Sequence, residues 1–551
     1  MARYIQKHWI AFAFALIFGG MLMAPHIRHH IVADDELFYM ARIQDVVDGH
    51  PFIGNAYLWE HKSDPPEQLF LVEWFLAQPM RLFHVSVPVG MVFEAGIAGF
   101  IVFLLVYILF YLVSRHRALA LGAAVFLLYG LLLTDMIRPI SPQFNIIFLL
   151  LQAIFLWQLI SSGSSERRWW IFSGVSFGLL FYVYPYYWTH VLVASVLLGI
   201  FLAIVCERSR AMQILKMLVL GGAVSIPYWY LTHLASQLPE YGDIMGRLTT
   251  LSHLPSGINV LLWSVGGFVC LAVFAHDRLR VRAPDALLCL ATVAASVVVV
   301  NQHVITGRNF EFSSHYIIGA IVFSVLAVLY AVTPYLKRAS AVRTIVLGGI
   351  SVFVAFSILG FWRANVTRAG SATSLRYAPL LAWLNTHTPP ESVIFADNAL
   401  SEYIPAFTRN NVYFAASANL FYISDSEILK RFSINNYFET VDRDFVLRNE
   451  RALFGVHYLD SYNHIQQINK LRRLFSLPPI QAQRIPDSAV STAIAAAQEM
   501  KKMPFESVLK SYRADYIVWD QRAHPAWRLD DGKFFREVFS DDQLIVYEVK
   551  K

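Results

Sequence analysis

Three consecutive carboxylates, Asp34, Asp35 and Glu36, follow the first apolar stretch of the chain. Carboxylates crowded beside a low-dielectric surface repel one another. We expect this crowding to raise the pKa of at least one of them into a range suited to accepting a proton near neutral pH. The same residues also suit the first turn of a helix, where acidic side chains favour the positive end of the helix dipole. The residues alone do not decide between these interpretations.

Asp135 and Arg138 form a second candidate pair, in a short polar segment between two later apolar stretches. A guanidinium donates two parallel hydrogen bonds to a phosphate, which makes Arg138 a candidate for binding a phosphate-bearing ligand. The alternative is an ordinary interfacial pair in which the two side chains bind each other or lipid head groups.

A third polar group occupies the segment from His303 to Arg308, with His315 behind it. We predict that Arg308 and His303 form a second phosphate clamp, because binding the leaving phosphate stabilises the charge that develops on it. Structural capping is the competing explanation. Tyr184 and Tyr186 belong to an aromatic cluster of the kind that interfacial belts produce, although flat aromatic faces also pack against sugars and prenyl chains. We retain both as binding candidates.

The elements that must position these groups are membrane helices. The chain has 551 residues, of which 56% are hydrophobic and only 15% charged, where soluble proteins carry roughly a quarter charged. A membrane span needs about 20 apolar residues. The sequence predicts eleven spans, at approximately 9–27, 88–113, 118–136, 143–160, 169–187, 188–206, 214–234, 257–275, 284–301, 315–335 and 341–361.

Basic residues orient these spans, because they gather in alternate loops. Arg3 and Lys7 precede the first span, and Arg115 and Arg117 follow the second. The positive-inside rule therefore predicts a cytoplasmic N-terminus in the plasma (inner) membrane, and an odd number of spans places the C-terminal part outside. The first apolar run lacks a small-residue cleavage site, which favours a retained anchor over a cleaved signal.

The chain divides into a membrane domain, residues 1–369, and a soluble domain, residues 370–551. Within the first, residues 28–87 form an outer loop whose helical patterning predicts two helices along the outer membrane surface, at 34–48 and 65–83. In the second, strand-like runs lie near 392–396, 411–415, 514–519, 534–539 and 543–549. These runs predict an extracytoplasmic α/β domain.

Composition excludes several functions. Basic and acidic residues are equal in number from residue 370 onward, so the whole net charge of +6 lies in the membrane part and gives no support for nucleic-acid binding. Cys206, Cys270 and Cys289 form no Cys-x-x-Cys pair, which argues against a disulfide framework or a thiolate metal site. A Gly-x-x-x-x-Gly-Lys-Ser/Thr loop is absent, which argues against an ATP-driven transporter.

The order of these features resembles the GT-C superfamily of membrane glycosyltransferases, which includes the protein O-mannosyltransferases and the bacterial lipid A aminoarabinose transferases. The resemblance rests on an Asp-Glu-x-x-Tyr motif at the outer end of the first span, the long loop after it, many further spans and an outer α/β domain. It implies that Asp35 is the catalytic acid-base residue, with Glu36 and Tyr39 as companions, and Asp135 as a second acid. Asp34 beside the motif leaves open which of the adjacent pair is the base.

The sequence thus predicts an inverting glycosyltransferase that takes a sugar from a polyprenyl-phosphate donor. The predicted acceptor is a protein, a lipid or a glycan. Membrane lipids are expected as further partners, and nucleic acid is not. No cofactor is expected and no metal site is predicted, although oligosaccharyltransferases of the same superfamily use a divalent cation. The alternatives are a transporter with Asp34, Asp35 and His303 as proton-coupling groups, and a non-catalytic scaffold. Coupling residues of transporters tend to lie mid-membrane on broken helices, which argues against the first alternative.

Overall fold

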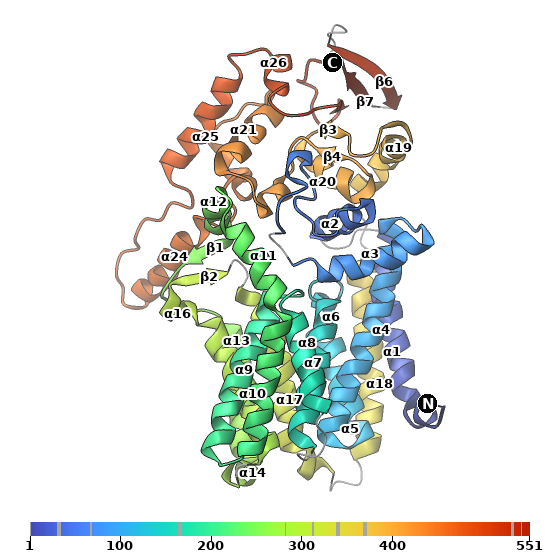
Figure 1. Cartoon of the computed structure of the whole chain (residues 1–551), viewed down its shortest axis with the longest axis vertical. Coiled ribbons are helices and arrows are strands. Elements are labelled where there is room, and N and C mark those ends of the chain that lie inside the picture. The colour runs from blue at the N-terminus through green and yellow to red at the C-terminus, as the bar shows by residue number, and fades with distance from the viewer. Residues whose placement is uncertain are drawn as a thin grey trace.

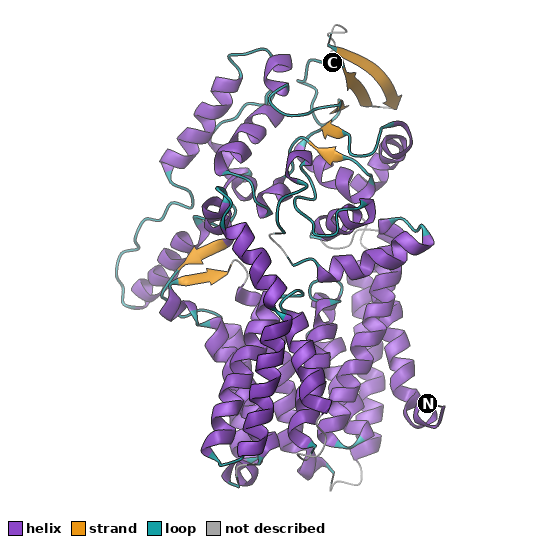
Figure 2. Cartoon of the chain, viewed as in Figure 1, coloured by secondary structure: helices purple, strands orange, loops and turns teal. Residues whose placement is uncertain are grey.

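In the computed structural model, a bundle of long helices stands beneath a mixed region of shorter helices and strands (Figure 1). Helix predominates throughout, and the strands are confined to the upper region and to a small ribbon beside the bundle (Figure 2). The structure describes residues 2–29, 35–66, 69–162, 168–281, 283–310, 313–337, 342–366, 372–529, 534–541 and 543–550. Asp34 and the predicted boundary between residues 369 and 370 lie outside these ranges.

Helices of membrane-spanning character make up the bundle. Five described helices are long and apolar enough to cross a bilayer: α1 (Ala2–His29), α4 (Val87–Ser114), α9 (Pro185–Ile204), α15 (Pro284–Val300) and α17 (Tyr316–Leu336). A sixth candidate is the pair α10 (Arg208–Val224) and α11 (Ile226–Ser236), which is bent by 47°. The remaining helices of the bundle are α5 (Arg117–Val125), continued by η2 (Phe126–Leu131), α7 (Asn145–Ser161), α8 (Arg168–Leu180), α13 (Ile258–Phe274) and α18 (Val342–Phe361).

Each of the eleven predicted apolar stretches coincides with one of these helices or helix pairs. The chain therefore has the helix content of a multi-pass membrane protein, while the number of crossings stays a prediction. Small residues allow the closest contacts. A Cβ on Gly19 of α1 would lie 2.4 Å from the carbonyl oxygen of Gly96 on α4, so these two helices pack almost backbone to backbone.

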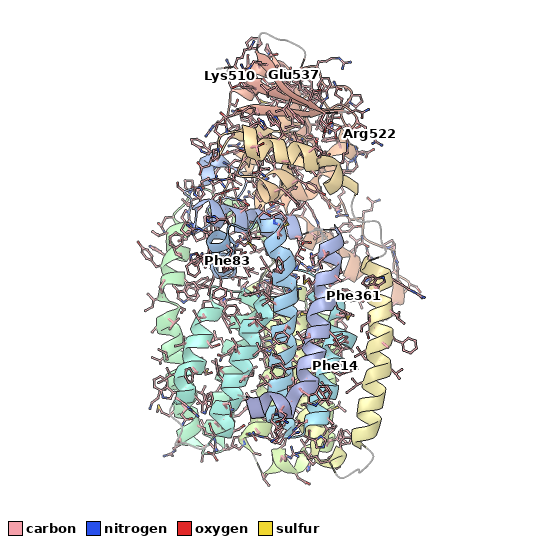
Figure 3. The ribbon with its side chains drawn as sticks, turned by 90° about the vertical axis from the view of Figure 1, so that its right-hand side faces the viewer. Phe14, Phe83, Phe361, Lys510, Arg522 and Glu537 are labelled. Carbon is pink, nitrogen blue, oxygen red and sulfur yellow. The ribbon has the colours of Figure 1, made fainter. Side chains whose placement is uncertain are left out.

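The segment after α1 forms two helices, α2 (Glu36–Asp48) and α3 (Leu71–Phe83), close to the predicted ranges. Helix α2 packs between α3 and α20 (Asn398–Phe407) of the C-terminal region. Helix α3 exposes large apolar side chains, including Phe75 and Phe83, and Figure 3 shows Phe83 near the end of the bundle next to the C-terminal region. The position of both helices along a membrane surface stays a prediction.

The C-terminal region contains a five-stranded sheet in the order β4-β3-β5-β7-β6. Its strands are β3 (Val393–Phe395), β4 (Asn411–Val412), β5 (Tyr516–Asp520), β6 (Phe535–Asp541) and β7 (Leu544–Val549). Strand β3 is parallel to β4 and β5, whereas β7 is antiparallel to both of its neighbours. The five strand-like runs predicted from the sequence thus all contribute to this sheet.

Shorter elements complete the chain. The other helices of the C-terminal region are α19 (Ala372–His387), α21 (Asp425–Asn435), α22 (Arg443–Arg448), α23 (Glu450–Phe454), α24 (Leu459–Leu474), α25 (Asp487–Met500) and α26 (Phe505–Leu509). The connections between bundle helices hold α6 (Leu133–Met136), α12 (Tyr241–Leu248), α14 (His276–Arg280), α16 (His303–Thr306) and the antiparallel ribbon of β1 (Thr249–Leu251) and β2 (Arg308–Phe310). One-turn segments are η1 (Trp59–His61), η3 (Ser313–His315), η4 (Trp362–Val366) and η5 (Ala416–Leu420).

Candidate active site

Asp35 and Arg138 form the centre of the candidate site. Asp35 stands directly before α2, and Arg138 lies in the connection between α6 and α7. The Arg138 Nη2 group donates to Asp35 Oδ2, and the two side chains are 35% and 31% exposed, respectively. The structure therefore joins a carboxylate and a guanidinium, 103 residues apart in sequence, where molecules from outside the bundle can reach both.

An aromatic and imidazole wall adjoins this pair. Tyr184, which caps α9, hydrogen-bonds through its hydroxyl to His315 Nδ1 at the start of α17. Burial lowers the pKa of His315 to about 4, and the positive charge of Arg138 acts in the same direction. His315 is therefore neutral near pH 7. A neutral imidazole carries one N–H donor and one ring-nitrogen acceptor, and Nδ1 is the nitrogen that faces Tyr184.

Tyr39 lies one helical turn after Asp35 on α2. Burial raises the pKa of Tyr39 well above its ordinary value, and the Asp35 carboxylate adds to this effect. The phenol therefore remains protonated near neutral pH and can donate a hydrogen bond. Ser141, in the segment after Arg138, interacts with the hydroxyls of both Tyr39 and Tyr184.

The segment after Arg138 is held in an unusual conformation. Ile140 has a φ of 62°, which is disfavoured for a β-branched residue, so surrounding contacts must maintain it. One of these is the buried side chain of Gln143, whose Nε2 donates to the Met136 carbonyl at 2.9 Å. The sequence analysis did not select Ser141. Its position between two prolines in an outer connection is the signal that could have indicated it.

Asp135 and Tyr186 lie beside the residues around Arg138 and His315. Asp135 is half-buried, and burial raises its pKa while Arg138 opposes the shift. Its backbone carbonyl accepts from the Arg138 amide at 3.2 Å, so the acid and the guanidinium share one turn. Tyr186 is buried, and its ring packs edge-on to His315 with centroids 5.3 Å apart. Tyr186 thus packs against His315 and helps to hold its imidazole ring in place.

Glu36 points away from the opening. It is fully buried, and its Oε1 lies 3.0 Å from Nδ1 of His26 on α1. Glu94 of α4, also buried, interacts electrostatically with both groups. Asp35 and Glu36 therefore meet different partners, Arg138 and His26, because adjacent residues at the start of a helix project in different directions. Asp34 is outside the described residues.

His303 and Arg308 are placed elsewhere. His303 is buried, and its Nε2 donates to the Leu254 carbonyl at 2.8 Å, which is a structural role in its connection. Arg308 is exposed in β2, where its backbone pairs with Leu251 of β1. Within the part of the chain that the structure describes, no hydrogen bond or ion pair links either residue to Asp35 or Arg138. A second phosphate clamp of His303 and Arg308 therefore stays a prediction.

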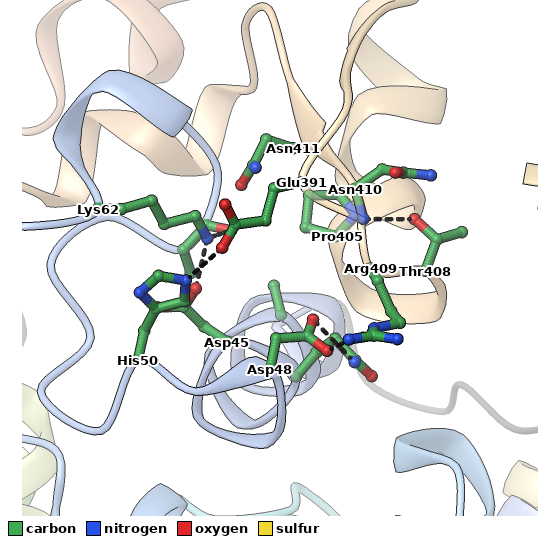
Figure 4. A pocket seen from close by; sticks show the side chains of 13 residues that line it. Asp45, Asp48, His50, Lys62, Glu391, Pro405, Thr408, Arg409, Asn410 and Asn411 are labelled. Atoms are coloured by element: carbon green, nitrogen blue, oxygen red, sulfur yellow. Dashed lines mark hydrogen bonds and ion pairs between the residues drawn. The ribbon is translucent and has the colours of Figure 1, made fainter. Parts of the chain in front are cut away.

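A polar pocket lies at the other end of α2, between this helix and the C-terminal region (Figure 4). Three ion pairs line it: Lys62 with Asp45, His50 with Glu391 at 2.8 Å, and Arg409 with Asp48 at 3.1 Å. Because the last two connect residues more than 300 positions apart, they fasten α2 to the C-terminal region. Among the described residues, no group of three or more His, Cys, Asp or Glu side chains could hold a metal ion.

No protein-family model and no curated protein matches the chain. Among solved structures, the crystal structure of ArnT from Cupriavidus metallidurans bound to undecaprenyl phosphate aligns with 14% identity and a TM-score of 0.45, over 98% of each chain. Similarity at this level leaves the function of the chain open.

Proposed function

We propose that the protein is a membrane glycosyltransferase that transfers a sugar from a polyprenyl-phosphate donor to a protein, lipid or glycan acceptor. The proposal includes its topology: a multi-pass protein of the plasma (inner) membrane with a cytoplasmic N-terminus and an extracytoplasmic C-terminal domain from about residue 370. The reaction takes place at the outer ends of the helices.

The observation that carries the proposal is the contact between Asp35 and Arg138. A transfer reaction of this kind needs a base for the acceptor and a cation for the departing phosphate, and it needs them within one sugar of each other. The Asp35 carboxylate and the Arg138 guanidinium meet that requirement. Tyr39 and His315 keep a neutral phenol and a neutral imidazole beside them, and such groups suit the hydroxyls of a sugar.

The ion pair also suggests how the site changes when the donor binds. Without a donor, Arg138 neutralises Asp35. The phosphate of an arriving donor competes for the same guanidinium, and bidentate phosphate binding is strong. Drawing Arg138 toward the phosphate frees the Asp35 carboxylate from its ion pair, so the carboxylate can accept a hydrogen bond from the acceptor once the donor is in place.

In the chemical step, Asp35 accepts the proton of an acceptor hydroxyl or amine. The freed lone pair attacks the anomeric carbon of the sugar from the face opposite the phosphate. The bond between that carbon and the phosphate oxygen breaks, and the electron pair leaves with the polyprenyl phosphate, held by Arg138. A single displacement of this kind inverts the anomeric centre.

The test is a transfer assay with the purified full-length protein. A radiolabelled polyprenyl-phosphate sugar is incubated with an extract of membrane acceptors, and both the labelled product and the released polyprenyl phosphate are followed. Transfer that depends on Asp35 supports the proposal. Passage of the label across proteoliposomes with the sugar-phosphate bond intact would instead favour a transporter, and binding without either outcome would favour a scaffold.

A further inference from the structure

Large apolar side chains are exposed in the turn that ends α24, residues 470–480, here named the α24 turn. Phe475 is 71% exposed and Leu474 is 76% exposed. The other exposed apolar residues of the turn are Leu471, Leu477 and Ile480. Soluble surfaces carry single apolar residues routinely, but a contiguous group of this kind marks an interaction site.

Hydrogen bonds of its own side chains hold the α24 turn in a defined conformation. Asn469 is buried, and its side chain closes the turn by donating to the Ile480 carbonyl at 2.9 Å and accepting from the Ile480 amide at 2.7 Å. The Arg472 Nε group donates to the Pro478 carbonyl at 2.7 Å across the middle of the turn. These bonds satisfy the polar groups within the turn and leave its apolar side chains on the outside.

The charge of the α24 turn has one sign. Lys470, Arg472 and Arg473 lie among the apolar residues, and residues 470–480 include no Asp or Glu. Basic side chains interleaved with large apolar ones are the composition that binds anionic lipid surfaces, where apolar groups enter the head-group region and cations meet phosphates.

The position of α24 agrees with that composition. Helix α24 packs against β1, and β1 is joined to the outer end of α13 by a connection of only six residues. Figure 1 shows α24 beside the ribbon at about the height of α3, on the opposite side of the bundle. Neighbouring apolar side chains are exposed as well, namely Leu251 on β1 and Ile305 on α16.

We propose that the α24 turn inserts into the bilayer surface on the side where the C-terminal region lies, with its basic residues on anionic lipid head groups. A second copy of the chain is a poorer occupant, because a symmetric contact would bring the basic residues of both copies together. The C-terminal region would then be held at two places, by the ion pairs of α2 and by the lipid surface beneath α24.

The experiment places an environment-sensitive fluorophore in the turn of the full-length protein. Cys206, Cys270 and Cys289 are replaced by serine or alanine, Phe475→Cys is labelled, and the protein is incorporated as single copies in nanodiscs containing lipids with a quencher in the upper acyl chain. Matched labels at Lys510→Cys, high on the C-terminal region, and Phe83→Cys, on α3, provide the negative and positive references (Figure 3).

We expect the label at position 475 to lose most of its fluorescence with quencher lipid, as position 83 does, while position 510 keeps its signal. Adding anionic lipid should increase the loss at position 475, and Arg472→Gln with Arg473→Gln should abolish that increase. An unquenched label at 475 would overturn the proposal. Contact between turns in discs that hold two copies, without lipid quenching, would replace the bilayer by a second chain as the occupant.

Discussion

Replacing Asp35 by Asn tests the proposed base directly. Asn preserves the size and shape of the side chain but cannot accept the acceptor proton. General-base catalysis contributes about 10²- to 10⁴-fold, so turnover should fall by that factor. This corresponds to about 2.7 to 5.4 kcal/mol of activation free energy.

The structure predicts a much smaller effect of Asp35→Asn on folding. The Asp35 side chain makes no capping hydrogen bond to α2. Its ion pair with Arg138 is about one-third exposed on both sides, and such pairs stabilise a fold by no more than about 1 kcal/mol. The loss of activity should therefore exceed the loss of stability several times over.

Donor affinity is expected to respond to Asp35→Asn differently from turnover. Asp35→Asn frees Arg138 from its intramolecular partner, so donor affinity should stay unchanged or rise by at most about fivefold, the equivalent of ~1 kcal/mol. A residue with a merely structural role would lower donor affinity when it is changed. Equilibrium binding of the labelled donor, turnover with the same donor and the unfolding temperature in detergent are measured on one preparation.

Asp48→Asn is the matched control, because it removes an ion-paired carboxylate from the other end of the same helix, far from the opening. It should leave turnover near wild type. The mechanism fails if Asp35→Asn retains wild-type turnover, or if the two variants lose activity in equal proportion. Retained activity in Asp35→Asn together with inactivity of Asp34→Asn would move the base to the adjacent position.

The remaining predictions concern the phosphate anchor and two contacts of the C-terminal region. Arg138→Ala should weaken donor binding by at least about tenfold, because charge-assisted hydrogen bonds to phosphate are lost, whereas Arg308→Ala should change it little; equal losses in isothermal binding would contradict this. The bonds of His61 to Asp64 and Glu427 outweigh burial and raise its pKa to about 9. That stabilisation is complete below pH 6.5 and is lost as the pH rises through about 9, so His61→Gln should flatten the decline of unfolding temperature over this window. Arg431→Met leaves two glutamates without their buried cation and should lower the free energy of unfolding by about 3 to 5 kcal/mol, measured by chemical denaturation; a change below 1 kcal/mol would show that the pairs contribute little.

The sequence predicts those elements whose signal is local. Apolar runs such as 88–113 must form helices to satisfy their backbone groups in lipid, and α4 follows that run almost residue by residue. The strand-like runs near 514–519 and 543–549 are also local signals, and β5 and β7 form within one or two residues of them. Asp35 and Arg138 could be selected because each is a charged residue at the predicted outer end of a span.

The pairing of residues distant in sequence could not be predicted in this way. Nothing local indicates that α2 is covered by α20, since that packing depends on ion pairs such as Arg409 with Asp48. His303 looked like a ligand-binding residue because polar density is visible in a sequence, whereas its hydrogen bond to the Leu254 carbonyl is not. Glu36 was grouped with Asp35 by adjacency, although its contact with His26 removes it from the opening.

Helix α2 joins two parts of the molecule as a strut. It runs for 13 residues, about 20 Å at 1.5 Å per residue, with Asp35 immediately before one end and with the helix packed against α20 of the C-terminal region. Because a helix moves as a rigid unit, a tilt of the C-terminal region would move α2 and with it Asp35 relative to Arg138. For protein engineering, this means that a shortened chain lacking the C-terminal region would lose the alignment of its carboxylate, and that chimeras should exchange α2 together with α20.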